Sequence, residues 1–182
     1  SLEIISKARK NGIHVSCSIT PAHLIFTDTD LQQYDPNLKV NPPFRLAEDR
    51  DFLQKGLLNG EIDCIASHHM PQDKDHKMVE FEYAQYGMNS LETAFALVKL
   101  SLPEISEDRL VEIFSLNARK IFNLPDASLA INKPASLTLF HPDYKWTFEK
   151  TYSKCSNSPF FGKEFRGKAL GIINKDRLFL ND

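Results

Sequence analysis

The order of helical and strand patterns in the first part of the chain restricts its fold more than any other feature. An apolar stripe with helical spacing over residues 2–8 precedes an alternating, β-branched run at residues 13–19. A second helix is predicted over residues 46–58. The apolar run that follows it, at residues 62–67, is typical of a strand buried on both faces of a parallel sheet. Helix, strand, helix, strand in this order predicts the α/β class.

The sequence pattern changes from helical to β-type toward the end of the chain. Helices are predicted over residues 90–102 and 106–122, and Ser106 is placed to cap the second of them. The final stretch consists of short β-type runs separated by Pro, Asn, Asp and Gly. We therefore expect one α/β unit at residues 1–125 and a small β-rich unit at residues 126–182.

Composition and charge exclude several classes of protein. With 42% hydrophobic residues the chain is too apolar for disorder, and its formal charge of -2 gives no basic field for nucleic acid. No apolar run approaches the roughly 20 residues that cross a bilayer, so no membrane span is expected. Three scattered cysteines without a CxxC pattern favour a reducing, cytoplasmic compartment. The chain begins inside a helical pattern without Met or a signal-peptide layout, which we interpret as a fragment or a processed chain.

Two long polar loops follow the predicted strands, where parallel α/β proteins bind their ligands. The loop at residues 27–43 has turn chemistry, and a loop of that length is more often functional than a plain connector. Asn41 near its end, together with Arg45, is able to hold a carboxylate or an amide, although Arg45 is equally compatible with a solvated side chain. This loop is one candidate binding segment.

The second loop, residues 68–87, begins with two adjacent histidines. Neutral imidazoles bind zinc, but adjacent residues at a strand end point in opposite directions, so His68 and His69 make a poor chelate for one ion. The charged run at residues 73–77 is expected to be a solvated surface turn. The sequence has no glycine-rich phosphate loop, HExxH or GxSxG motif, so phosphate-binding, zincin and serine-hydrolase chemistries lack support.

Five blocks of sequence extend through essentially the whole chain. They are residues 19–24 (ITPAHL), 40–45 (VNPPFR), 56–66 (GLLNGEIDCIA), 90–94 (SLETA) and 158–162 (SPFFG). In this order and spacing they resemble the C-terminal part of a dihydroorotase of the zinc amidohydrolase superfamily. The Asn of the Asn-Pro-Pro triplet separates the chain from hydantoinase-like and allantoinase-like relatives.

The resemblance implies the C-terminal part of a TIM (β/α)8 barrel, with residues 126–182 contributing to a small β-sandwich. In the family the other metal ligands, an HxH pair and three more, would lie upstream of Ser1. An incomplete barrel leaves strand edges unpaired, so the N-terminal half of the same protein is the first expected partner. We also expect a homo-oligomer.

One segment departs from the family pattern. Residues 65–72 (IASHHMPQ) match the family's Ile-Ala-Thr-Asp-His-Ala-Pro-His, in which the Asp binds zinc and acts as the general base while the last His contacts substrate. Here these two positions are His68 and Gln72. A neutral imidazole can ligate a metal ion but cannot offset its charge, so we expect impaired binding of the family's zinc. Substrate-contact positions are matched by Asn41 and by Tyr86 and Gly87, with Tyr86 replacing the usual Phe.

Two functions follow from the resemblance. The first is a dihydroorotase-like protein of pyrimidine biosynthesis with an impaired site and a scaffold role alongside aspartate carbamoyltransferase. The second is a working metal-dependent hydrolase that interconverts dihydroorotate and carbamoyl aspartate. The loss of two functional positions, His68 and Gln72, in one loop favours the first function. A dihydropyrimidinase-like interaction protein is a third, weaker reading.

Overall fold

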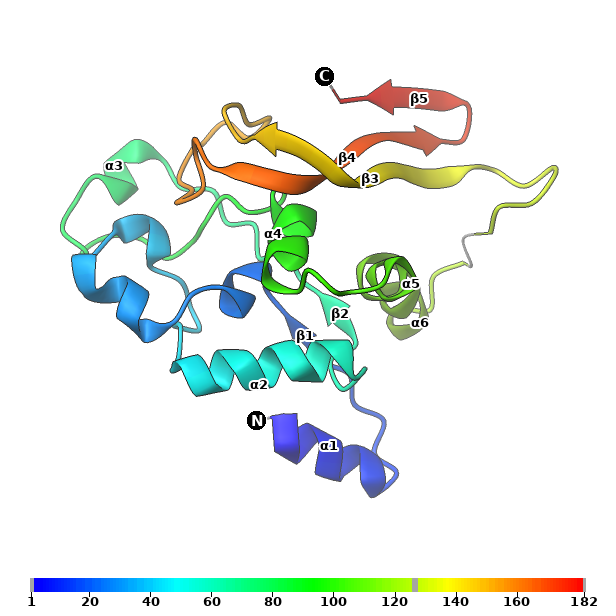
Figure 1. The fold of residues 1–182 in the computed structure, drawn as a ribbon, viewed down its shortest axis with the longest axis horizontal. Coiled ribbons are helices and arrows are strands. Elements are labelled where there is room, and N and C mark those ends of the chain that lie inside the picture. The colour runs from blue at the N-terminus through cyan, green and yellow to red at the C-terminus, as the bar shows by residue number, and fades with distance from the viewer. Residues whose placement is uncertain (1, 126–127, 182) are drawn as a thin grey trace.

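The computed structural model describes residues 2–125 and 128–181, so Ser1 and the predicted boundary at residue 126 lie outside the described residues. Helices and strands alternate in the first part, and an antiparallel sheet forms the last (Figure 1). The helices are α1 (Leu2–Lys10), α2 (Ala47–Leu58), α3 (Lys74–Lys77), α4 (Ala94–Ser101), α5 (Glu107–Val111) and α6 (Asn117–Ile121). The strands are β1 (Ser18–Ile19), β2 (Cys64–Ile65), β3 (Ser136–Thr147), β4 (Glu164–Asn174) and β5 (Arg177–Leu180).

The strands β1 and β2 pair in parallel, as the α/β pattern predicts, but both are shorter than expected. Only Ser18↔Cys64 and Ile19↔Ile65 are paired. The ladder ends on the amino side because the Asp63 carboxylate, rather than a strand carbonyl, accepts the Cys17 N–H at 2.7 Å. Both β2 residues are half-buried, so the expectation of a strand buried on both faces was wrong.

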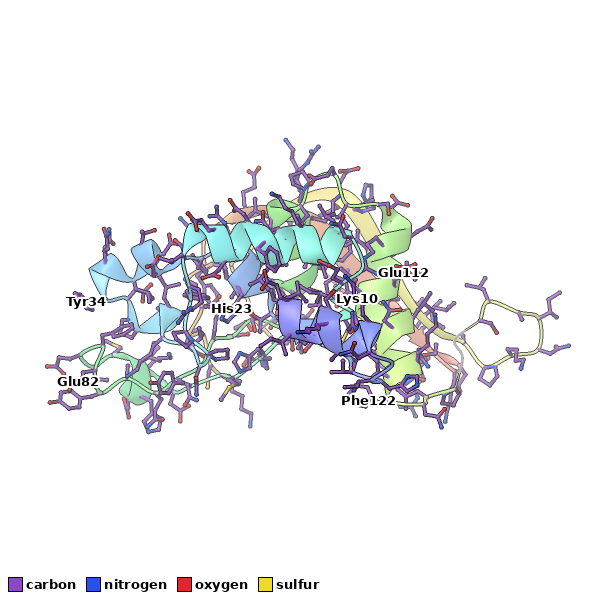
Figure 2. All side chains as sticks on the ribbon, turned by 90° about the horizontal axis from the view of Figure 1, so that it is seen from below. Lys10, His23, Tyr34, Glu82, Glu112 and Phe122 are labelled. Carbon is purple, nitrogen blue, oxygen red and sulfur yellow. The ribbon has the colours of Figure 1, made fainter. Side chains whose placement is uncertain are left out.

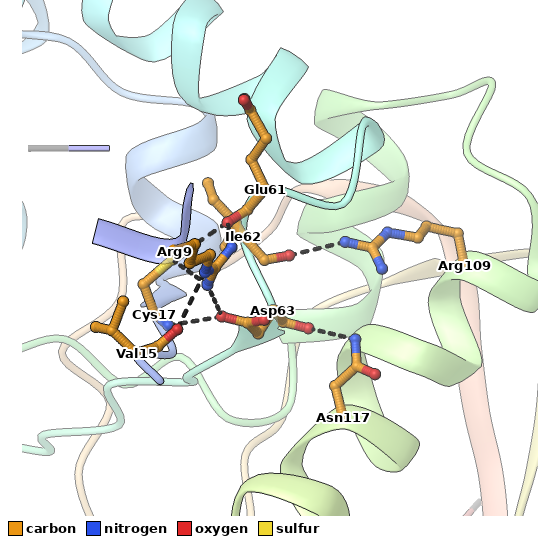
Figure 3. Close-up of polar contacts among 8 residues, drawn as sticks. All are labelled: Arg9, Val15, Cys17, Glu61, Ile62, Asp63, Arg109 and Asn117. Carbon is orange, nitrogen blue, oxygen red and sulfur yellow. Dashed lines mark hydrogen bonds and ion pairs between the residues drawn. The ribbon is translucent and has the colours of Figure 1, made fainter. Parts of the chain in front are cut away.

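An ionic cluster holds the amino ends of these strands (Figure 3). Arg9 of α1 forms an ion pair with Asp63 and donates to the carbonyl oxygens of Val15 at 3.0 Å and Glu61 at 2.7 Å. Because Asp63 also accepts from Cys17, one carboxylate joins α1 to both strands. We call these contacts the amino-end cluster.

The last helices brace the same end of the strands. Arg109 of α5 donates to Leu57 O at 3.0 Å and Ile62 O at 2.8 Å, and the Asn117 amide of α6 donates to Asp63 O at 2.8 Å. The Ile62 and Asp63 carbonyl groups lie directly before β2, whereas Leu57 O belongs to the last turn of α2. A π-helical segment (Glu112–Leu116) joins α5 to α6, so the helix expected over residues 106–122 is continuous but not uniformly α.

Local helix signals predict the helix ends well. The α2 helix begins one residue after Leu46, carries Glu48 and Asp49 in its first turn, and is followed by Gly60 at φ +81°. The Ser106 hydroxyl caps α5 by accepting the Arg109 N–H at 3.2 Å, as expected. The α4 helix starts at Ala94, a few residues later than the predicted 90–102.

The expected long loops are more ordered and more buried than their polar composition indicates. Two 3₁₀ segments, Asp28–Gln33 and Pro36–Leu38, shape the first loop, a third at Pro21–Leu24 precedes it, and Leu38 and Val40 are buried. In the second loop residues 73–77 were expected to be a solvated turn, which was wrong for Lys77. Its side chain is only 6% exposed because two carbonyl oxygens accept from its ammonium group.

The tail sheet has the antiparallel order β3-β4-β5, with α4 packed against it (Figure 1). At Gly167, with φ +91°, an added Cβ would lie 2.8 Å from Phe95 of α4, so glycine permits this close approach. Within residues 2–125 and 128–181 the tail forms this three-stranded sheet, and its contribution to a small β-sandwich stays a prediction.

One hydrophobic cluster joins the tail to the α/β part, and we call it the seam cluster. It consists of Ala22, Leu38, Val40, Phe44, Met88, Ala96 and Leu97 from the first part and Phe148, Phe160 and Phe165 from the tail. A second cluster, which includes Leu57, Val98 and Ile113, packs around the parallel strands. The apolar core therefore crosses the predicted boundary between residues 125 and 126. None of the described helices is long and apolar enough to cross a membrane.

Candidate functional site

The carboxyl ends of β1 and β2 open at the same edge, because the strands are parallel and adjacent. Pairing continues for one more bond, in which Ala66 N donates to Ile19 O at 2.9 Å. The chain then leaves β1 toward His23 and leaves β2 toward His68, as expected for a ligand-binding edge. Seen from below, Tyr34 and Glu82 of the two loops lie at one end of the molecule, away from Lys10 and Phe122 (Figure 2).

Both ring nitrogens of His23 have partners. Its Nδ1 lies 2.7 Å from the Thr20 hydroxyl and its Nε2 lies 3.0 Å from Pro42 O. An Nε2–H that donates to the carbonyl, with Nδ1 accepting from Thr20, satisfies both contacts. Burial lowers the pKa of His23, and the nearby His68 lowers it further against the opposing effect of the Pro42 carbonyl. His23 is therefore held as a neutral ring beside His68.

His68 occupies an unusual backbone position. It is half-buried and has φ +51°, in the left-handed region that side chains with a Cβ seldom adopt. The next residue, His69, binds the backbone: its Nδ1 accepts the N–H groups of Ser90 at 3.3 Å and Leu91 at 3.2 Å. The Nδ1 of His69 is thus bound to the backbone of the chain just before α4.

The donors of the described chain do not by themselves fit a zinc ion. No group of three or more His, Cys, Asp or Glu side chains is arranged to hold a metal within residues 2–125 and 128–181. His23 has both nitrogens committed, and His69 has one. Asp73, an acid close in sequence to His68, accepts from the Cys155 thiol at 3.2 Å.

Three of the predicted substrate-contact residues lie together. The Gln72 amide donates to Tyr86 O at 3.0 Å, and Gly87 N donates to Lys39 O at 2.9 Å. Gly87 has φ +133°, and a Cβ there would lie 2.5 Å from Met70 O, so only glycine allows the two chain segments to meet. The second loop therefore folds back on itself at Gln72, Tyr86 and Gly87.

The fourth residue, Asn41, is exposed and lies beside this group. Two residues before it, Lys39 O accepts from Gly87, and immediately after it Pro42 O lies against His23. Asn41 therefore belongs to a segment that touches both the Gly87 side and the His23 side of the edge.

Sequence reasoning missed the two lysines that fix the loops. Lys39 Nζ donates to Phe81 O at 2.8 Å and Glu82 O at 2.7 Å, and it lies 5.0 Å from the centre of the Tyr86 ring. Lys77 Nζ donates to two more carbonyl oxygens, each at 2.7 Å, and burial lowers its pKa to about 8. Lys39, together with Phe81 and Tyr86, lines an open cavity of about 770 Å³. A charged run in the sequence gives no signal for such buried contacts.

Asn157 was also missed. It lies in the connection from β3 to β4, directly before the block at residues 158–162, and its side chain is bonded to the predicted substrate-contact segments. The only hint in the sequence is its place beside that block.

Comparisons with known proteins were made by sequence and by structure. No family model matches the chain. A dihydroorotase of Aquifex aeolicus is 35% identical over 187 residues, covering 100% of this chain and 44% of that protein. A dihydroorotase of Lactiplantibacillus plantarum is 38% identical over 184 residues, covering 98% of this chain and 43% of that protein. The chain thus spans less than half the length of the curated relatives it matches.

Solved structures share the fold. The D-hydantoinase (dihydropyrimidinase) of Thermus sp. superposes with a TM-score of 0.87 at 21% identity, over 100% of this chain and 42% of that one. The L-hydantoinase (dihydropyrimidinase) of Arthrobacter aurescens gives 0.84 at 26% identity, over 99% of this chain and 42% of that one. The comparisons therefore confirm the resemblance stated from the sequence: over essentially its whole length this chain is similar to part of a dihydroorotase, and it shares its fold with part of these hydantoinases.

Proposed function

We propose that this chain is part of a dihydroorotase-like protein of pyrimidine biosynthesis whose ring-opening site is impaired. In this proposal residues 1–125 complete a TIM barrel begun by the N-terminal half of the same protein, and residues 126–182 contribute to a small β-sandwich. The protein acts in the cytoplasm as a homo-oligomer and as a scaffold beside aspartate carbamoyltransferase. The observation that carries the proposal is His68 at the carboxyl end of β2.

The chemistry of His68 supports this function. The family resemblance assigns to that position an Asp that binds zinc and takes a proton from water. An imidazole brings no negative charge to a cation, and its ring lies close enough to His23 to lower the pKa of that neighbour. Asp73, an acid five residues beyond His68, is exposed, and its Oδ1 accepts from the Cys155 thiol.

Gln72 adds a second argument. In the family a His stands here and contacts substrate, and it is able to become a cation. The Gln72 amide instead donates to Tyr86 O and stays neutral at every pH. A site that lacks both the acid and the cation has lost the groups that move protons and balance charge.

A second function stays in consideration because part of the site is kept. Asn41, Tyr86 and Gly87 match substrate-contact positions of the family, and Gly87 has the close backbone approach that only glycine allows. These residues support a working cyclic amidohydrolase that interconverts dihydroorotate and carbamoyl aspartate. The two functions differ in turnover.

The deciding experiment measures turnover of dihydroorotate by the purified full-length protein. General base catalysis contributes about 10²–10⁴-fold, so we expect activity near the detection limit at neutral pH. The double variant His68→Asp with Gln72→His should raise the rate if the upstream ligands are intact. His76→Asp is the matched control, because His76 is an exposed residue of α3. Substantial turnover by the unmodified protein overturns the impaired-site proposal.

Metal analysis and co-elution test the remaining parts. We expect less than one zinc ion per chain in protein purified without chelators, because the position of one ligand is changed to His68. We expect the full-length protein to co-elute with aspartate carbamoyltransferase in size-exclusion chromatography. One or two zinc ions per chain contradict the first expectation, and separate elution contradicts the second.

A further inference from the structure

The connection between β3 and β4 reaches into the candidate site. The Asn89 amide donates to the Thr151 hydroxyl at 3.0 Å and to Cys155 O at 2.8 Å, and the backbone N–H of Asn89 donates to Asn157 O at 2.9 Å. Asn89 is buried, with 1% of its surface exposed. A stretch of the tail is thereby fixed against the chain that follows Gly87.

The side chain of Asn157 joins the two predicted substrate-contact segments. Its Oδ1 accepts the backbone N–H of Gln72 at 2.9 Å, while its Nδ2 donates to Gly87 O at 3.2 Å. Because Gln72 in turn donates to Tyr86 O, the contacts close a ring through four residues. Asn157 is only 6% exposed, so water does not compete readily for these bonds.

This arrangement needs an amide at residue 157. One planar group accepts from one chain segment and donates to another, and the side-chain amide of Asn does both from two atoms on the same carbon. An Asp at this position keeps the acceptor for the Gln72 N–H, but it sets a carboxylate oxygen against Gly87 O. An Ala leaves both buried backbone groups without their partner.

We infer that Asn157 is a positioning residue: from the tail, it sets the spacing between Gln72 and Gly87 and so sets the affinity of the site for a small carboxylate-bearing cyclic or open-chain amide. It does so without touching that ligand. The inference rests on the proposed function, in which Gln72 and Gly87 face the ligand. It makes the tail a working part of the site.

The test is calorimetric titration of the full-length protein with dihydroorotate and with carbamoyl aspartate. We expect Asn157→Ala to weaken binding by about tenfold or more, because two buried hydrogen bonds that order the site are lost. Asn157→Asp should fall between this variant and the wild type. The matched control is Asn117→Ala, which removes an amide bond to Asp63 O at the opposite end of the strands. The control should lower the melting temperature but leave affinity unchanged.

A measurement on the unmodified protein guards against variants that fail to fold. Ligand should slow hydrogen exchange at the Gln72 amide, whose acceptor is Asn157 Oδ1, and in residues 151–157. Unchanged exchange there, unchanged affinity in a folded Asn157→Ala variant, or no ligand binding by wild type each overturns the inference. Substantial wild-type turnover overturns only the impaired-site proposal, and Asn157→Ala should then raise KM more than it lowers kcat.

Discussion

The two ends of the β1–β2 pair are built from different chemistry. At the amino end, the Arg9 and Asp63 charges meet directly, and Asp63 also holds Cys17. At the carboxyl end, imidazole, amide and lysine ammonium groups contact uncharged partners, as in the bonds of His23 to Pro42 O and of Lys39 to Phe81 O. The amino end has fixed charges that stabilise the strands. The carboxyl end leaves its polar groups to the loops, which is where α/β proteins keep their ligand chemistry.

The two ends also differ in backbone geometry, because residues with positive φ angles lie at the carboxyl end. The carboxyl end carries His68 at φ +51° and Gly87 at φ +133°, while the residues of the amino-end cluster have ordinary backbone angles. Unfavourable backbone geometry is tolerated where function requires a particular side-chain direction. The two ends should therefore respond in opposite ways to substitution.

The largest expected effect is at the amino end. Asp63→Ala in the full-length protein should lower the free energy of unfolding by about 2–3 kcal/mol, because Arg9 loses its ion-pair partner and the Cys17 N–H loses its acceptor in a partly buried place. Denaturant unfolding measures this loss. Asp51→Ala is the control: it removes an exposed pair with Arg50, and should cost less than about 1 kcal/mol. If both variants lose the same free energy of unfolding, the charges of the amino end do not stabilise the strands more than an exposed ion pair does.

An intermediate effect is expected in the loops of the carboxyl end. In the unfolded chain Lys77 has the ordinary lysine pKa of 10.5, whereas burial in the folded protein lowers its pKa to about 8. Between these values the unfolded state binds more protons, so stability rises with pH, and the cost of the buried charge is full only below pH 8. Relative to Lys77→Met, the wild type should gain about 2 kcal/mol between pH 7 and pH 10.

Unfolding by denaturant at pH 7, 8.5 and 10 provides the comparison for Lys77. Lys74→Met serves as the control, since Lys74 is exposed on the same short helix and its stability difference from wild type should not change with pH. Parallel pH curves for wild type and Lys77→Met contradict the assignment of the titration to Lys77.

The smallest effect is a gain. His68→Gly should raise stability by about 0.5 kcal/mol, because glycine adopts φ +51° without the steric cost of a Cβ, while its greater freedom in the unfolded chain offsets part of the benefit. His69→Gly should instead destabilise, since the N–H groups of Ser90 and Leu91 lose their acceptor. If both variants destabilise equally, His68 is not strained.

The elements predicted well are those whose signals are local. Ser106 caps its helix through a bond to a residue three positions away, and Gly60 ends α2 through its own backbone freedom. Strand length was overestimated because it depends on where a partner stops pairing, which Asp63 decides from 46 residues beyond Cys17. The hydrophobic periodicity of a strand does not predict a contact with a carboxylate so far away in the sequence.

The residues of the candidate site also fall into those that the sequence predicted and those that depend on contacts between distant segments. The resemblance singled out Gln72 and Gly87, and they meet because the second loop, which contains both, folds back on itself. Asn157 acts across 85 residues on Gln72, and Lys77 reaches Pro36 across 41 residues. Hydrogen bonds over such separations arise only when the tail and the loops pack, so residue spacing does not reveal them.

The seam between the tail and the α/β part contains a natural optical reporter. Trp146 is the single tryptophan of the chain; its indole N–H donates to Gly167 O at 2.8 Å, and its ring centre lies 5.6 Å from that of Phe165 in the seam cluster. Indole fluorescence depends on the polarity around the ring, so emission should shift to longer wavelength when the tail separates from α4. Stopped-flow fluorescence can then follow that separation without any attached label.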